Sequence, residues 1–203
     1  MALFCTAYFP PIAMLAKMLQ ADNVQVEVKE TFPKQTYRNR AVIMTAGGLR
    51  QLTVPVVRPN GNHSRTEEIS ISYTQRWNQV HLRTIEAAYS ASPYYMYYKD
   101  DIETILSSHY RLLIDLNKEI FCWINDRLRL PLSPSLTTDF KPAGEDGDFR
   151  YVYTPKRPLS DVYFPPYYQT FSDRFAFESN LSILDLMMNL GPESRAYLAA
   201  LEV

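Results

Sequence analysis

The strongest fold signal lies near the start of the chain, in the stretch LFCTAYFPPIAMLAKMLQADNVQVEV that spans residues 3–28. Residues 3–7 are apolar enough for a short buried strand, and Pro11 suits the first turn of a helix that runs to about residue 20. Valines at alternate positions from residue 24 to residue 28 predict a second strand. This order predicts two parallel strands joined by a right-handed crossover.

A hairpin and several helices are expected next. Residues 41–45 and 52–56 flank a glycine-containing turn, which predicts two antiparallel strands, with Pro55 marking a sheet edge or a strand end. Apolar residues recur at helical spacing from residue 77 to residue 88. They recur again from residue 102 to residue 124, with a break near Ser107-Ser108.

Local signals also place helix ends and an irregular segment. Ser92-Pro93 predicts an N-cap followed by proline in the first helical position. Ser182 and Asp185 have the spacing of a capping box, and Gly191-Pro192 ends the helix that it opens. Residues 130–164 hold five prolines and an acidic turn, and we expect an ordered flap there.

These elements predict one domain over residues 1–203. We expect an α/β fold, in which a mixed sheet is flanked by helices and the C-terminal half is helical, with α+β as the alternative.

The composition narrows the range of partners. The net charge of −1, without a basic stripe, argues against nucleic acid, and no apolar run approaches the length of a membrane span. The N-terminus lacks a basic region and its apolar stretch is broken by Pro10-Pro11, so we expect no signal peptide and a cytoplasmic protein. Cys5 and Cys122 lie in apolar segments, which predicts buried, reduced thiols.

Absent motifs exclude several reaction classes. The six glycines form no G-x-G-x-x-G, no P-loop and no G-x-S-x-G elbow, which argues against dinucleotide redox chemistry, Walker-type ATP hydrolysis and α/β-hydrolase chemistry. The cysteines and histidines have no zinc-site spacing. We therefore expect no cofactor and no metal.

One polar run stands out, Lys34-Gln35-Thr36-Tyr37-Arg38-Asn39-Arg40, just before the strand expected at residue 41. Its three cations suit a phosphate or carboxylate, because guanidinium groups hold such anions bidentately. Its two amides suit a sugar or an amide. The alternative is a solvated, charged strand edge.

Three further residues are candidates. Helical spacing with Trp77 and Ile85 places His81 on an apolar face, where it is either a general base or a buried structural histidine kept neutral by burial. Arg150 and Lys156 in the expected flap either close over an anionic ligand or pair with the acidic turn before them.

Short motifs occur in one order along nearly the whole chain: Tyr8-Phe9-Pro10-Pro11, residues 34–40 and 52–56, Trp77 with His81, residues 89–93, 168–171 and 180–185. In this combination the chain resembles the WbqC-like family. Members of that family are often associated with gene clusters for O-antigen or other surface polysaccharides, and aminoacyl transfer to a sugar has been one suggestion. Many relatives carry a His-Gln pair where this chain has Phe4-Cys5-Thr6-Ala7, which puts a mechanism based on that loop in doubt.

The resemblance implies a sugar-modifying group transferase that transfers an aminoacyl or acyl group to an anionic or nucleotide-linked sugar. The alternative is a non-catalytic module that binds a sugar or a protein within a biosynthetic assembly. We expect the catalytic set to be His81, Arg38, Asn39 and Arg40. The expected substrate-binding set is Lys34, Gln35, Tyr8, Tyr89, Tyr94, Arg150, Lys156, Tyr168 and Gln169.

Overall fold

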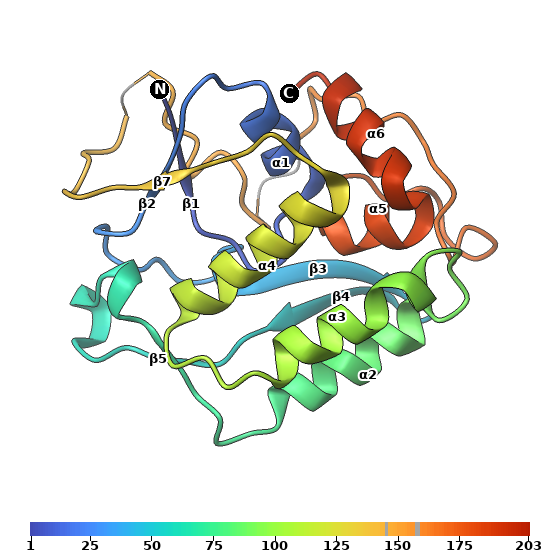
Figure 1. The fold of residues 1–203 in the computed structure, drawn as a ribbon, viewed down its shortest axis with the longest axis horizontal. Helices are drawn as coiled ribbons and strands as arrows, with labels where there is room; N and C mark the ends of the chain where they lie inside the picture. The colour runs from blue at the N-terminus through green and yellow to red at the C-terminus, as the bar shows by residue number, and fades with distance from the viewer. Residues whose placement is uncertain (145, 157–158) are drawn as a thin grey trace.

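The computed structural model describes residues 1–144, 146–156 and 159–203. Figure 1 shows the parallel strands on one side of the molecule and helices α2 and α3 on the other, with the β3–β4 hairpin between them. Parallel and antiparallel strands both occur, and helices flank them. The predicted fold class, a mixed sheet arrangement with helices, is confirmed.

The N-terminal unit forms as predicted. Strand β1 (Ala2–Cys5) leads through helix α1 (Ile12–Leu19) to strand β2 (Val24–Glu27), and the two strands pair in parallel. Pro11 is the N-cap of α1, and the first two N–H groups of the helix, those of Ile12 and Ala13, donate to the Leu181 oxygen and to Asn180 Oδ1.

Two later segments extend this parallel sheet. Strand β7 (Ser135–Leu136) pairs with the outer side of β2, and residue 148 bridges to Leu3 on the far side of β1. The bridge consists of two backbone hydrogen bonds of 2.8 Å, one from Leu3 N to the Gly147 oxygen and one from Phe149 N to the Leu3 oxygen. Residues 135–136 and 147–149 of the segment expected as a flap therefore lie along the two edges of the sheet, and the Phe149 ring stacks on Phe4 at 5.2 Å.

The hairpin is also confirmed, with β3 (Arg40–Thr45) paired to β4 (Gly48–Thr53). Gly48 follows the turn at a φ of 96°, a conformation that favours glycine. The strand expected through residue 56 divides at Pro55, because proline cannot donate to a strand ladder. Beyond it, β5 (Val56–Val57) pairs with β6 (Ser70–Ile71), and the 3₁₀ turns η1 (Gly61–His63) and η2 (Thr66–Glu68) connect them.

Helices supply most of the remaining chain. They are α2 (Trp77–Tyr89), α3 (Tyr95–Ser107), α4 (Leu113–Leu128), α5 (Ile183–Leu190) and α6 (Ser194–Ala200), with the 3₁₀ turn η3 (Gly191–Glu193) before α6. The break expected near residue 107 separates α3 from α4. The N-cap predicted at Ser92 is wrong, because its hydroxyl donates back to the Tyr89 oxygen and α3 starts after Tyr94.

The Cys5 thiol is buried as expected, but Cys122 is exposed, so that part of the thiol prediction is wrong. Cys122 lies on α4 between the buried residues Ile120 and Ile124, at a position that turns away from the core. Both cysteines are free. None of the helices in the described ranges is long and apolar enough to cross a membrane.

Candidate functional site

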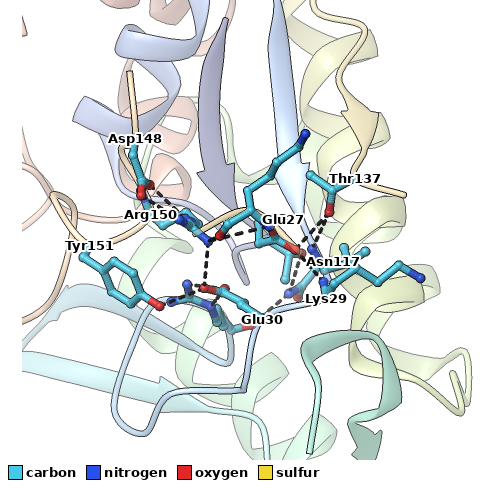
Figure 2. A network of polar contacts seen from close by, with 12 residues as sticks. Glu27, Lys29, Glu30, Asn117, Thr137, Asp148, Arg150 and Tyr151 are labelled. Atoms are coloured by element: carbon cyan, nitrogen blue, oxygen red, sulfur yellow. Dashed lines mark hydrogen bonds and ion pairs between the residues drawn. The ribbon is translucent and has the colours of Figure 1, made fainter. Parts of the chain in front are cut away.

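A cluster of buried charged side chains lies at the carboxyl end of β2 (Figure 2). Glu27 is the last residue of β2 and Glu30 follows in the next loop, while Arg38 precedes β3. Arg150 and Asp148 arrive from the segment that bridges β1. We call these five residues the ion cluster. Arg38 and Arg150 are each only 1% exposed.

Each guanidinium in the ion cluster has a carboxylate partner. Arg38 donates through Nε to Glu30 Oε1 at 2.8 Å, and its Nη2 contacts the same oxygen. Arg150 forms a bidentate pair with Asp148, at 2.8 Å from Nε and 2.7 Å from Nη2. Its Nη1 lies 3.6 Å from Glu27 Oε2 and 3.9 Å from Glu30 Oε2. Three carboxylates thus surround two cations, and both positive charges are matched inside the protein.

Neutral groups complete the ion cluster. Glu27 accepts hydrogen bonds from the Thr137 hydroxyl at 3.0 Å and from the Lys141 backbone at 2.9 Å. The Tyr151 hydroxyl donates to Glu30 Oε2 at 2.9 Å, and its ring lies 5.5 Å from the Arg38 guanidinium and 5.8 Å from that of Arg150. The cluster therefore fastens the irregular chain after β7 to the end of the sheet.

Three members of this cluster, Arg38, Asp148 and Arg150, have pKa values shifted toward their charged forms. Hydrogen bonding to Asp148 raises the pKa of Arg150, and the same contact lowers the pKa of Asp148. Burial acts to lower the pKa of Arg38, but the neighbouring Cys5 and Glu30 outweigh it and the net pKa is raised. In the described ranges, no group of His, Cys, Asp and Glu side chains is arranged to hold a metal ion.

A cavity of about 190 Å³ opens beside the ion cluster, between β1, α1, α4 and β7. Its walls are apolar: Ala7, Pro10, Met14, Met18, Val26, Ile114, Phe121, Pro134 and Leu136. Its polar lining is confined to Cys5 and Thr6 from β1 and the loop after it, and Asn117 and Lys118 from α4. Asn117 is buried, whereas Lys118 is exposed, so the lysine stands at the open side.

Asn117 links this cavity to the ion cluster. Its Nδ2 donates to the Thr6 hydroxyl at 3.1 Å and to the Arg38 backbone oxygen at 2.8 Å. Its Oδ1 is buried and has no hydrogen-bond partner among the described residues. Burial raises the pKa of the Cys5 thiol, although the nearby Arg38 opposes the shift, so Cys5 is a neutral thiol at pH 7.

Sequence reasoning missed these cavity residues. Asn117 lies at helical spacing with the buried Leu113 and Ile120, so a polar side chain on the apolar face of α4 was the available signal. Thr6 follows the first parallel strand directly, and the carboxyl ends of parallel strands are the usual location of ligand sites.

His81 lies elsewhere, on the inner face of α2. Its Nδ1 is 2.9 Å from the Tyr8 hydroxyl, and its ring packs edge-on against Trp77. Burial lowers the pKa of His81 to about 4, although the Thr53 backbone opposes the shift. His81 lines a second cavity, of about 290 Å³, together with Gln51 and Thr53 of β4.

The expected catalytic residues thus fall in different places. Arg38 belongs to the ion cluster and His81 to the second cavity. Arg40 is half-buried, and its Nη1 donates to Gln51, a residue of the second cavity, at 3.3 Å. The Asn39 amide donates to the Val54 oxygen at 2.9 Å, which ties the chain before β3 to the end of β4.

The expected substrate-binding residues are similarly spread. Lys34, Gln35 and Lys156 are exposed, and Tyr168 is 62% exposed. Tyr94 packs so closely on Gly191 that a Cβ there would lie 2.4 Å from its ring. Tyr8 is buried against His81, and Arg150 pairs with the acidic turn, which is the alternative considered for it.

Tyr89 and Gln169 meet at a second buried polar centre, Asp185 of α5. Asp185 accepts from Tyr89 at 3.1 Å, from Tyr167 at 2.6 Å and from Gln169 Nε2 at 3.0 Å. Burial raises the pKa of Asp185, and these hydrogen bonds only partly oppose the shift. Because the Asp185 carboxylate binds these partners, it does not complete the capping box expected with Ser182. The Ser182 hydroxyl accepts from Leu184 N, and Ile183 N donates to the Pro10 oxygen.

Comparison of the chain with known proteins identifies its family. The model of the WbqC-like protein family matches residues 6–156, which include the ion cluster, His81 and the cavity residues Thr6, Asn117 and Lys118. A protein of Mycobacterium tuberculosis described as uncharacterized is 27% identical over 217 aligned residues, covering 94% of this chain and 91% of that protein. No solved structure gives a significant match. The matched range covers well over half of the chain, and the chain therefore belongs to the WbqC-like protein family.

Proposed function

We propose that the protein is a sugar-modifying group transferase of surface-polysaccharide biosynthesis, and that its substrate binds in the cavity beside β1. One observation carries the location: the cavity lies at the carboxyl end of parallel strands, with apolar walls and a few convergent polar groups. Family membership supports the pathway, because the resemblance implies O-antigen or related chemistry.

The proposed reaction moves an acyl or aminoacyl group from an activated carrier to a hydroxyl or amino group of a sugar. A bond forms between the acyl carbon and the sugar oxygen or nitrogen, the bond to the carrier breaks with its electron pair on the carrier, and the proton of the acceptor passes to the released carrier. Thr6 and Asn117 orient the substrate, and Lys118 attracts an anionic part such as a phosphate. The ion cluster acts by holding the chain after β7 against the sheet.

This assignment changes the role expected for the arginines and for His81. Arg38 and Arg150 are already paired with carboxylates of the ion cluster. We therefore assign binding of the anionic part of the substrate to Lys118. A histidine with a pKa of about 4 is a weak base at neutral pH, and we assign His81 to the core between Tyr8 and Trp77.

A non-catalytic sugar-binding module is the second candidate. It is favoured by the neutral thiol at Cys5, since the thiolate is the reactive form of cysteine, and by the internal pairing of both buried arginines. Such a module needs the cavity but no activated group.

The test is to incubate the protein with nucleotide sugars and activated acyl or aminoacyl donors, with products followed by mass spectrometry and binding by calorimetry. We expect a sugar product whose mass has grown by the transferred group. Lys118→Met should weaken binding of the anionic substrate by about tenfold, as expected for one charge-assisted contact. Lys99→Met on α3 is the matched control and should leave binding unchanged.

The two candidates separate in this experiment. Binding without product from any donor would support the module and overturn the transferase. Product formation that Lys118→Met does not affect would keep the transferase and remove the cavity as its site.

A further inference from the structure

The orientation of the Asn117 amide is fixed by its neighbours. Its Nδ2 contacts the backbone oxygen of Arg38, and a carbonyl oxygen accepts hydrogen bonds but cannot donate one. The amide nitrogen must therefore face Arg38, and Oδ1 is left as an acceptor. Oδ1 is shielded from solvent and unpartnered among the described residues, and a buried polar atom without a partner costs free energy. Since Asn117 lines the cavity, a ligand N–H or O–H there gains a hydrogen bond once the side chains around Oδ1 shift to admit it.

Thr6 offers the complementary group. Its oxygen already accepts from Asn117 at 3.1 Å, so one lone pair is used while the hydroxyl proton remains available. In the described parts of the chain this proton has no acceptor. The polar end of the cavity thus presents one donor, on Thr6, beside one acceptor, on Asn117.

The apolar walls of the cavity restrict which ligand can carry the matching donor and acceptor. Met14, Met18 and Val26 line it, and burying further unpaired polar atoms against them costs free energy. A carboxylate would set an acceptor against Asn117 Oδ1. A sugar hydroxyl satisfies both groups with one oxygen, but its ring neighbours would bring more hydroxyls against the apolar wall.

We infer that the cavity recognises a secondary amide with a small alkyl group, namely the acetamido group of an N-acylated amino sugar. The amide N–H donates to Asn117 Oδ1, the amide oxygen accepts from Thr6, and the methyl group packs against Met14 and Met18. This inference rests on the proposed function for the choice of a sugar as the carrier of the amide.

Methionine-methyl NMR tests it, because Met14 and Met18 line the cavity. The protein is labelled at its seven methionine methyl groups, which are assigned by Met→Leu variants, and titrated with N-acetylglucosamine, glucosamine and glucose. We expect N-acetylglucosamine to move the Met14 and Met18 signals, with glucose and glucosamine at least about tenfold weaker. Equal responses to all three sugars, or no response to N-acetylglucosamine, would overturn the inference.

A pair of buried threonines gives a matched comparison. Thr6→Val keeps the shape but removes the hydroxyl, and should weaken N-acetylglucosamine binding by about threefold to tenfold while leaving the weak glucose response unchanged. Thr66→Val removes another buried hydroxyl, one that is unpartnered in the described structure and does not line the cavity, and should leave N-acetylglucosamine binding unchanged. An unchanged N-acetylglucosamine affinity in Thr6→Val would contradict the assigned contact.

Two further tests ask whether the amide belongs to a sugar or to a peptide, and whether the inference holds independently of the proposed function. N-Acetylglycine methylamide carries the same group on a peptide-like frame, and tighter binding of this probe would contradict the amino-sugar assignment. If an amide-free sugar is acylated in the transferase assay, the proposed function survives and this inference fails. If N-acetylglucosamine binds but no donor yields product, the inference survives and transferase activity is lost.

Discussion

The two sides of the molecule bury polar groups by opposite means. Beside the parallel strands, contacts between opposite charges raise the pKa of Arg150 and lower that of Asp148, so the charged forms are favoured. On the helical side, burial lowers the pKa of His81 to about 4 and raises the pKa of Asp185, so burial favours the neutral form of each side chain. The presence of an oppositely charged partner decides which effect wins.

The difference suggests a division of labour. Paired ions give directional contacts that hold an irregular segment in one arrangement, as Arg150 does with Asp148 and the backbone oxygen of Lys141. Neutral polar groups meet at Asp185 of α5, which accepts from Tyr89 of α2 and from Tyr167 and Gln169 in the irregular chain before α5.

The largest effect on stability is expected from removing one charged side chain of the ion cluster. Arg38→Met leaves Glu30 buried without its closest cation and should lower the free energy of unfolding by about 3–5 kcal/mol, measured by urea denaturation. Adding Glu30→Gln to this variant should recover much of the loss, because the stranded charge is gone. Arg174→Met, in an exposed pair with Asp173, should change stability by less than about 0.5 kcal/mol. A similar loss in both single variants would refute the contrast between buried and exposed pairs.

On the helical side, low pH should destabilise the fold through protonation of His81. Its pKa falls from 6.5 in the unfolded chain to about 4 in the fold, so the unfolded chain binds the proton first. The stabilisation is complete above pH 6.5 and should decline by about 3 kcal/mol as the pH drops to 4. Denaturation series at several pH values should show that His81→Gln lacks this decline, while His63→Gln, at an exposed turn, keeps it. Parallel curves for His81→Gln and wild type would place the acid sensitivity in another group.

The smallest effect is expected at Asp185. Asp185→Asn removes a charge that burial already disfavours, but the new amide nitrogen cannot accept from Tyr167 or Gln169. We expect a loss of about 1–3 kcal/mol in thermal or urea unfolding at pH 7, below that of Arg38→Met. Asp173→Asn is the exposed control. A larger loss at Asp185 than at Arg38 would reverse the comparison.

Much of the fold could be predicted because its signals are local. Pro11 and the alternating valines give the strand–helix–strand unit, and helical spacing gives the burial of His81. Two predictions were wrong because contacts with neighbouring residues determine the outcome. The Ser92 hydroxyl donates back to the Tyr89 oxygen rather than capping α3, and Cys122 lies on the outer face of α4 although its segment is apolar.

Less of the candidate site could be predicted. The sequence marked Arg38 and Arg150 as notable, but their carboxylate surroundings depend on contacts between distant segments. Tyr151 reaches Glu30 across 121 residues of chain, through a segment without helical or strand periodicity. Asn117 meets Thr6 across 111 residues, and no pattern in either local stretch predicts that pairing.

The bridge between Leu3 and Asp148 bears on how the chain is made. Leu3 pairs with Gln25 on one side and with Asp148 on the other, so its second partner is synthesised more than a hundred residues after its first. At about 5–20 residues per second, the nascent chain carries an open strand edge for several seconds or more. Such an edge invites pairing between neighbouring chains, and closing so distant a contact slows folding. Chaperone dependence during translation should therefore end only when the segment around Asp148 emerges.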